Sequence, residues 1–159
     1  MRIRLSSHAL RQRIATLEEA LENDGSVSRP APSHEPPEGL WYVDLQVEAP
    51  GYGLPPMAAY RYQEWWRSNG GEWELVAYAY DYRFGPDRRG VFGFHWHEMR
   101  AIDPTGDPVH HVKCVDPIPP ARDHHFRGTR MDVWEARDEL TRLDAAAIWP
   151  TCKGLRPLA

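Results

Sequence analysis

Two histidines separated by one residue stand in an apolar and aromatic segment, "GVFGFHWH", at residues 90–97. Alternate side chains of a β-strand point to opposite faces, so His95 and His97 share one face and the aromatic residues share the other. The aromatic face is expected to lie in the core. Both imidazoles then lie together on the more accessible face, where they can hold one metal ion or act on one small chemical group.

The neighbouring segments add further polar side chains to this pair. Asp81 and Arg83 precede the turn "GPDRRG", and they lie beside the histidines if the two strands pair regularly across it. His111 and Lys113 share one face of the strand that is predicted next along the chain. The sequence therefore predicts a catalytic site made of His95, His97, Asp81, Arg83 and His111.

Three interpretations of this site stay open, and beside them a non-catalytic RNA- or protein-binding module that would use the same basic and aromatic surface. In the first, the histidines are ordinary polar residues on the half-exposed face of a sheet. In the second, they bind a metal ion, because His-x-His on a strand is a common ligand pair and neutral imidazole suits Zn, Fe, Ni or Mn. The cupin ligand pattern is incomplete, however, because Glu98 follows His97 directly and its side chain points to the other face.

The third interpretation is cleavage of RNA without a metal. The ribose 2′-hydroxyl attacks its own phosphate, and the enzyme supplies a base, an acid and cations, with no cofactor. Imidazole titrates near neutrality and suits both proton transfers, while arginine makes bidentate contacts to phosphate. No competing nucleophile is indicated, because the chain has neither a Gly-x-Ser-x-Gly motif nor a phosphate-cradling glycine loop.

The N-terminal segment, residues 1–24, is predicted to contain a helix from about residue 7 to residue 23. Apolar residues recur there at spacings of four, three and four and form one stripe: Leu10, Ile14, Leu17 and Leu21. A Pro-rich linker at 25–39 separates this helix from an α+β domain predicted over 40–159. The stripe is expected either to pack on its own domain or to pair with another chain, which would allow a homodimer.

The α+β domain is predicted to hold one antiparallel sheet of about five strands, with a C-terminal helix packed on it. Five alternating segments indicate the strands: "LWYVDLQVE", "AAYRYQEWWR", "EWELVAYAYDYR", "VFGFHWH" and "VHHVKCV". The sequence "SNGG" is typical of a hairpin turn, and Thr129 and Asp132 fit a capping pattern before the last helix. One row of aromatic side chains is expected either to pack under a helix or to stack on RNA bases: Tyr78, Tyr80 and Tyr82.

Charge and composition restrict the classes of protein that remain. A chain of 159 residues can form one domain, and a net charge of −4 gives no overall signature of a nucleic-acid-binding protein. Residues 83–130 carry eight Lys or Arg against six Asp or Glu, so this segment is the one expected to face an anion. Its candidate RNA contacts are Arg88, Arg89, Lys113, Arg122, Phe126, Arg127 and Arg130.

The cysteines and the apolar segments bear on the compartment. Cys114 and Cys152 are the two cysteines of the chain, and neither belongs to a Cys-x-x-Cys pair, which favours the reducing cytoplasm. The N-terminus lacks the apolar region of a signal peptide, and no apolar run approaches the roughly 20 residues that span a membrane. The sequence therefore predicts a cytoplasmic protein with no membrane segment.

Several short motifs resemble those of the TumE-like toxins of type II toxin–antitoxin systems: "YRYQEWW", "WELVAYAYDYR", "GFHWHE" and "DVWEARDEL". The resemblance places the family's Tyr-Asp pair at Tyr80 and Asp81, and its histidine stretch at His95 and His97. The chain departs from the family pattern where a tyrosine replaces the asparagine after the aspartate, and where a tryptophan interrupts the histidines. What the resemblance implies is a growth-inhibiting toxin that acts on RNA and is neutralised by a cognate antitoxin protein.

Overall fold

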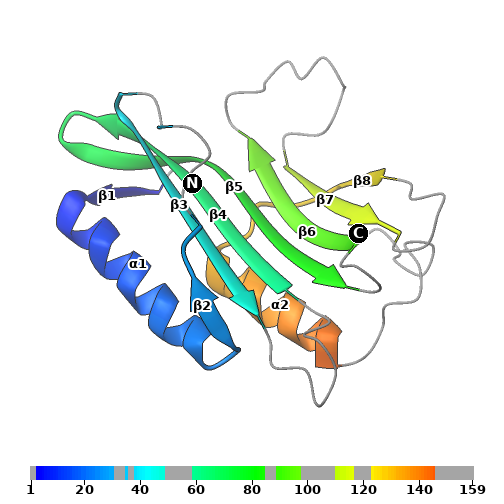
Figure 1. The fold of residues 1–159 in the computed structure, drawn as a ribbon. Helices are drawn as coiled ribbons and strands as arrows, with labels where there is room; N and C mark the ends of the chain where they lie inside the picture. Colours follow the sequence, from blue (N-terminus) through cyan, green and yellow to red (C-terminus); the bar gives the residue numbers. More distant parts are fainter. Residues whose placement is uncertain are drawn as a thin grey trace.

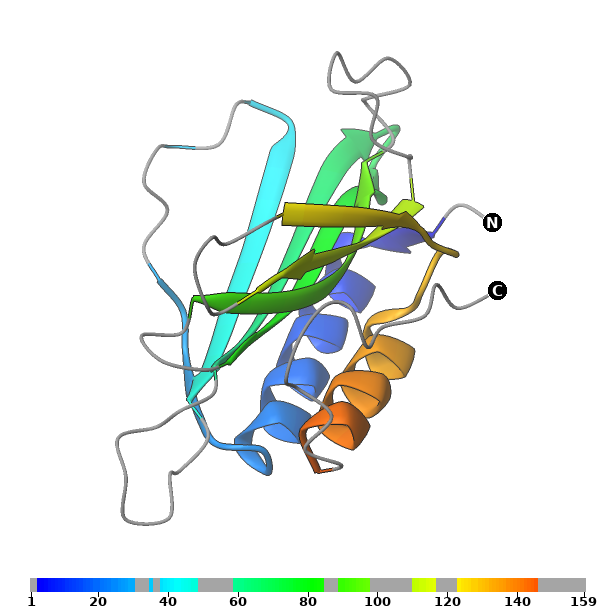
Figure 2. The same ribbon diagram turned by 90° about the vertical axis from the view of Figure 1, so that its right-hand side faces the viewer.

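The computed structural model describes residues 3–30, 35, 38–48, 59–84, 89–97, 110–116 and 123–145. This part of the chain forms one antiparallel sheet and two helices (Figure 1). Both helices pack on the same side of the sheet, as the second view shows (Figure 2). The architecture is therefore α+β with an antiparallel sheet, as the sequence predicts.

The elements follow one another along the chain with short strands at both ends of the sheet. They are β1 (Arg4–Ser6), α1 (Ser7–Glu22), β2 (Ser26–Ser28), β3 (Leu40–Glu48), β4 (Ala59–Asn69), β5 (Glu72–Phe84), β6 (Gly90–His97), β7 (His110–Val115), β8 (Asp123–Arg127) and α2 (Val133–Ala145). The strands lie in the order β2-β3-β4-β5-β6-β7-β8, and β1 pairs with β5. β4 runs along one edge of β5, whereas β6 and β1 share its other edge end to end.

The described part of the sheet has eight strands, so the prediction of about five was too low. The additional strands are β1, β2 and β8. β1 and β2 have three residues each, which is too short for an alternating pattern to show in the sequence. β8, with the sequence "DHHFR", lies outside the five segments in which alternation predicts a strand, and it is a strand because it pairs with β7.

The hairpin between β4 and β5 is the one that the sequence "SNGG" predicts. Asn69 pairs with Glu72, and the two residues between them have φ angles of 61° at Gly70 and 87° at Gly71. Side chains rarely adopt positive φ, so glycine is suited to both positions of a two-residue turn. This turn sets the register of the two longest strands.

The apolar stripe of α1 is buried against the sheet of its own chain. Its side chains are between 0% and 6% exposed: Leu10, Ile14, Leu17 and Leu21. At the end of the helix, Asp24 forms an ion pair with Arg137 of α2, with 2.6 Å between Oδ2 and Nε. Packing on its own domain, one of the two arrangements expected for the stripe, is therefore the one observed.

The aromatic row of β5 lies in the core under the helices. Tyr78 and Tyr80 are 0% exposed, Tyr82 is 3% exposed, and the first two rings stack with centroids 4.5 Å apart. Since these rings are covered, the structure supports packing under a helix and gives no open platform for RNA bases.

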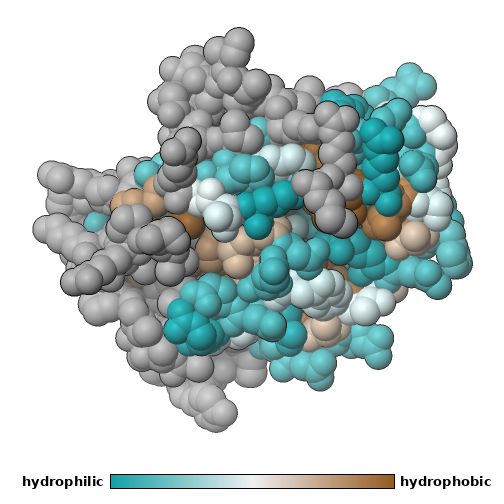
Figure 3. Space-filling model, turned by 180° about the vertical axis from the view of Figure 1, so that it is seen from behind, coloured by the Kyte–Doolittle hydropathy of each residue, from teal (hydrophilic) through white to brown (hydrophobic). Residues whose placement is uncertain are grey.

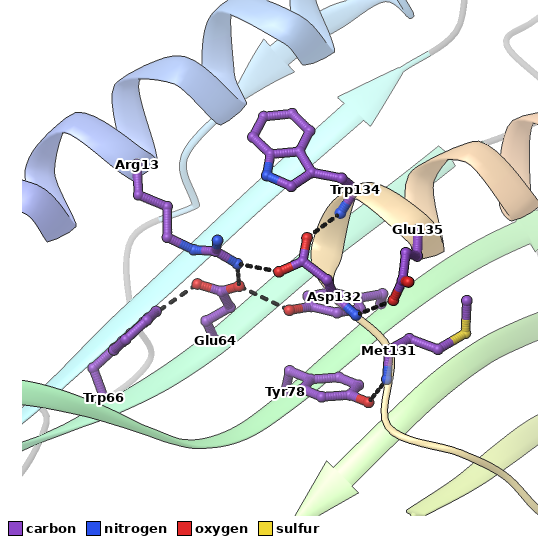
Figure 4. A network of polar contacts seen from close by, with 9 residues as sticks. Arg13, Glu64, Trp66, Tyr78, Met131, Asp132, Trp134 and Glu135 are labelled. Carbon is purple, nitrogen blue, oxygen red and sulfur yellow. Dashed lines mark hydrogen bonds and ion pairs between the residues drawn. The ribbon is translucent and has the colours of Figure 1, made fainter. Parts of the chain in front are cut away.

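One buried carboxylate, Glu64 of β4, joins both helices to the sheet (Figure 4). It accepts hydrogen bonds from Arg13 of α1 at 2.9 Å, Tyr80 at 2.7 Å and Trp66 at 3.0 Å. Arg13 also lies 3.6 Å from Asp132, the residue before α2. Removing one partner of a buried ion pair costs about 3–5 kcal/mol, so this group is a major part of the packing between the layers.

The start of α2 is a capping box. The Asp132 carboxylate accepts a hydrogen bond from the backbone N–H of Trp134 at 2.9 Å, and Glu135 accepts one from the backbone N–H of Asp132 at 2.9 Å. Of the two capping residues that the sequence suggests, Asp132 therefore fills this role.

The surface on the helix side is mostly hydrophilic where the structure describes it, and hydrophobic residues show only in small areas (Figure 3). Neither described helix has the length and apolar character needed to span a membrane.

Cys114 is buried and disulfide-bonded. The other cysteine of the chain, Cys152, lies outside the described residues. This bond argues against the reduced state that the sequence analysis expected, because disulfides are rare in a reducing compartment.

Candidate functional site

The face of the sheet opposite the helices carries the predicted catalytic residues, and strand pairing brings four of them together. Asp81 of β5 stands opposite Gly93 of β6, and His95 of β6 stands opposite His111 of β7. His97 lies on the same face, two residues further along β6. The regular pairing that the sequence argument assumed is therefore present.

Three imidazole rings, the histidine cluster, form the centre of this site: His95, His97 and His111. The ring centroids of His95 and His111 are 5.2 Å apart, those of His97 and His111 5.8 Å, and those of His95 and His97 6.1 Å. One ring nitrogen of each residue lies within 4.8 Å of the other two. His111 is 4% exposed and the His95 side chain 12% exposed, so the cluster is largely shielded from water.

A short hydrogen bond connects the cluster to a buried carboxylate. Nε2 of His95 lies 2.7 Å from Oδ1 of Asp81, whose side chain is 10% exposed. An ionised carboxylate can only accept a hydrogen bond, so Nε2 of His95 is the donor in this pair, and in the neutral imidazole Nδ1 then carries the lone pair. The pair thus fixes both the tautomer and the orientation of this imidazole.

Gly93 makes room for that hydrogen bond, and the sequence argument did not include it in the site. A Cβ at this position would lie 2.1 Å from Oδ1 of Asp81 and 2.7 Å from the carbonyl oxygen of Tyr80. Any side chain at Gly93 would therefore displace the carboxylate that holds His95. A glycine inside a strand pattern often marks such a close approach, and this is the signal that could have identified it.

Arg61 of β4 also stands opposite Asp81, but its guanidinium is turned toward a different carboxylate. Its Nε and Nη2 donate to the two oxygens of Asp44 over 3.0 Å and 2.6 Å, and the Tyr42 hydroxyl donates to the same group over 2.9 Å. The Arg61 guanidinium is therefore engaged by Asp44 in a bidentate ion pair.

His125 of β8 lies beside the cluster, although the sequence analysis predicted no strand there. Its ring stacks on that of His111, with centroids 4.7 Å apart and planes 12° from parallel. It reaches this face because β8 pairs with β7 and sets His125 opposite Lys113. The paired histidines of "DHHFR" were a weak signal, since period-2 alternation cannot be recognised in five residues.

His110, next to His111 in the chain, points to the helix side of the sheet. Its ring stacks on that of Trp96, with centroids 5.8 Å apart and planes 6° from parallel. Burial, and then the positive charge of Arg130, lower the pKa of His110 below its ordinary value. The two adjacent histidines therefore differ in surroundings, and only His111 belongs to the site.

The predicted RNA contacts are divided between the two faces. By register, Arg83 and Lys113 lie on the face of the cluster, since Arg83 stands opposite Val91 and Lys113 opposite Gly93. Arg89, the residue before β6, is exposed. Phe126 packs against the hydrophobic core, and the Arg130 guanidinium lies over the Trp96 ring at 4.3 Å, so both belong to the helix side.

For three of the predicted RNA contacts, the side chain lies outside the described part of the structure. Arg88 and Arg122 lie outside the described residues. For Arg127 the structure describes the backbone, which pairs with His111 on the edge strand β8.

Comparison of the chain with models of protein families, with curated proteins and with solved structures gave no match. The resemblance to the TumE-like toxins therefore rests on the short motifs of the sequence alone.

Proposed function

We propose that this protein is a ribonuclease that cleaves RNA by histidine acid–base catalysis. The observation that carries the proposal is the hydrogen bond of 2.7 Å between the buried Asp81 carboxylate and His95, beside two further imidazoles. A base held by a third group and placed next to a potential acid is the arrangement that proton-transfer catalysis requires.

The roles of the residues follow from this geometry. Nδ1 of His95 takes the proton of the ribose 2′-hydroxyl, because Nε2 is already bonded to Asp81. His97 or His111 donates a proton to the leaving 5′-oxygen, since both rings lie within about 6 Å of His95 by centroid distance. Arg83 and Lys113, on the same face, stabilise the charge of the phosphate as the bond breaks.

The biological role is proposed from the sequence motifs. The resemblance to TumE-like toxins supports a toxin of a type II toxin–antitoxin system, with RNA as substrate and a cognate antitoxin covering the basic segment 83–130. A cytoplasmic location is proposed because RNA is the substrate, although the disulfide at Cys114 does not support it. Dimerisation through α1 is not part of the proposal, because the stripe of that helix is covered in a single chain.

The test compares two histidine variants on opposite faces of the sheet. His95→Gln is expected to lower the rate of RNA cleavage by about 10²–10⁴, which is typical for loss of a general base. His110→Gln, which removes a histidine from the helix side, is expected to retain activity. Cleavage is measured in EDTA with purified protein, and the product should end in a 2′,3′-cyclic phosphate.

Two outcomes would replace this proposal. RNA binding without any cleavage by the wild-type protein would indicate a non-catalytic binding module. Cleavage that stops in EDTA and returns with one divalent ion would favour a metal-dependent enzyme, the second candidate, which the three ring nitrogens within 4.8 Å of one another support.

A further inference from the structure

We propose that His95, His97 and His111 form a binding site for one divalent transition-metal ion of the zinc class, and that an ion bound there inhibits RNA cleavage. The binding site stands on the geometry of the cluster alone. Its inhibitory effect rests on the proposed function and extends it, because the ion becomes a regulator of the same residues.

The three donors need only small movements to enclose an ion. Their ring nitrogens lie within 4.8 Å of one another, whereas a tetrahedral ion with bonds of about 2.0–2.1 Å to nitrogen holds its donors about 3.3 Å apart. His95 and His111 stand directly opposite on paired strands, so the backbone already fixes their spacing.

Asp81 supplies the outer partner that metal-binding histidines commonly have. A histidine bound to a metal usually donates its other ring N–H to a carboxylate or a carbonyl, which orients the ring and increases its basicity. Asp81 accepts this hydrogen bond from Nε2 of His95 and so leaves Nδ1 for the ion. The space above Gly93 exists for this carboxylate, since a Cβ there would lie 2.1 Å from Oδ1.

The donor atoms select the kind of ion. Three imidazole nitrogens suit Zn²⁺, Co²⁺, Ni²⁺ or Cu²⁺, whereas Mg²⁺ and Ca²⁺ require oxygen ligands. The stacking of His125 on His111, with ring planes 12° from parallel, restricts the orientation of one donor before any ion arrives. Burial of His111 further reduces the loss of side-chain freedom on binding.

The bound ion would inhibit cleavage because it would occupy the nitrogen that acts as the base, Nδ1 of His95. Nδ1 of His95 has a single lone pair, which either bonds to the ion or meets the 2′-hydroxyl of the substrate. An ion on that lone pair therefore blocks the base, while the other two imidazoles are held away from the leaving group.

The experiment uses the full chain, freed of metal with a chelator and titrated with Co²⁺. We expect one bound ion per chain, with the strong visible absorption of Co²⁺ in a nitrogen-rich site of low coordination number. Asp81→Asn should weaken binding about 10- to 100-fold, as is typical for loss of an outer-shell partner, and His97→Gln should weaken it further. The control His110→Gln should bind as the wild-type chain does.

Cleavage is then measured with metal-free protein and with increasing Zn²⁺. Binding of Co²⁺ to wild type and control, together with loss of cleavage as Zn²⁺ fills the site, supports the proposal. Failure of the wild-type chain to bind, or equal binding by His97→Gln, overturns the site even if cleavage in EDTA persists. Binding that activates cleavage, or leaves it unchanged, overturns the inhibitory effect while the site stands.

Discussion

Two buried carboxylates on opposite faces of the sheet have different partners. Glu64, on the helix side, accepts hydrogen bonds from three side chains, one of which is the arginine of α1. Asp81, on the face opposite the helices, is bonded to a histidine. Arginine keeps its charge at every ordinary pH, whereas histidine gains and loses a proton near neutrality. The surroundings of Glu64 therefore suit a structural role, and those of Asp81 are compatible with a chemical role.

Glu64 and Asp81 also differ in the number of hydrogen bonds that they accept. Glu64 is 2% exposed, and both of its oxygens have donors, so a change there leaves Arg13, Tyr80 and Trp66 with reduced bonding. Asp81 binds through Oδ1 to Nε2 of His95. We expect substitutions on the helix side to change stability most, and substitutions on the face opposite the helices to change activity and ligand binding most.

The largest effect on stability is expected from Glu64→Ala. This substitution leaves the charge of Arg13 partly buried without its nearest counter-ion, and we expect the free energy of unfolding to fall by about 3–5 kcal/mol. Chemical denaturation measures the change. The control is Glu72→Ala, an exposed glutamate at the start of β5, which should change stability by less than about 0.5 kcal/mol. If Asp81→Ala costs as much as Glu64→Ala, the contrast between the faces is wrong.

Gly93→Ala is expected to have a smaller effect on stability and a strong effect on the site. The added methyl group overlaps Oδ1 of Asp81 and the carbonyl oxygen of Tyr80, and such overpacking typically costs about 1–3 kcal/mol. The displaced carboxylate can no longer orient His95, so cleavage and Co²⁺ affinity should both fall. Denaturation, cleavage and Co²⁺ titration of this one variant provide the measurements.

A double-substitution cycle sharpens the interpretation of Gly93. In the Asp81→Ala background the contact with Oδ1 no longer exists, so Gly93→Ala should cost less than it does in the wild-type chain. Equal costs in the two backgrounds would show that the overlap with the backbone of Tyr80, rather than with the carboxylate, determines the effect.

The smallest expected effect is a loss of stability at alkaline pH, caused by Tyr80 on the helix side. Burial, and then the nearby Glu64 carboxylate, raise the pKa of Tyr80 well above its ordinary value of about 10. The unfolded chain therefore releases this proton first, and stability that is present below about pH 10 is lost as the pH rises above it. Tyr80→Phe should lose less stability than wild type between about pH 9 and pH 11. Equal losses would exclude Tyr80 as a contributor.

The sequence allowed the predicted catalytic residues of β5 and β6 to be placed on one face, because each of these strands is long enough for alternation to be recognised. The stripe of α1 and the hairpin at Gly70 were predictable for the same reason, since both depend on local spacing. His125 and Gly93 were missed. Their importance depends on which residue stands opposite them in a neighbouring strand, and spacing along one segment carries no information about that.

Arg130 is a residue that the sequence analysis included among the RNA contacts and that the structure places elsewhere. Its charge and its place in a polar segment suggested contact with RNA, yet the guanidinium lies over Trp96 on the helix side. Cation–π contact with a buried aromatic ring is a tertiary interaction that composition does not reveal. The three short strands were unpredictable because pairing with longer neighbours, rather than intrinsic preference, makes them strands.

The pairing of β1 with β5 affects when β1 can fold as the chain is synthesised. Arg4 pairs with Glu74, so β1 leaves the ribosome before β5 and has no partner until β5 has followed it. The strands from β3 to β8 instead pair with their neighbours in sequence, and contacts of this local kind form early. During synthesis of the intervening residues, β1 and the apolar stripe of α1 remain without their final partners. A chaperone that recognises apolar helical stripes would meet the nascent chain in that interval.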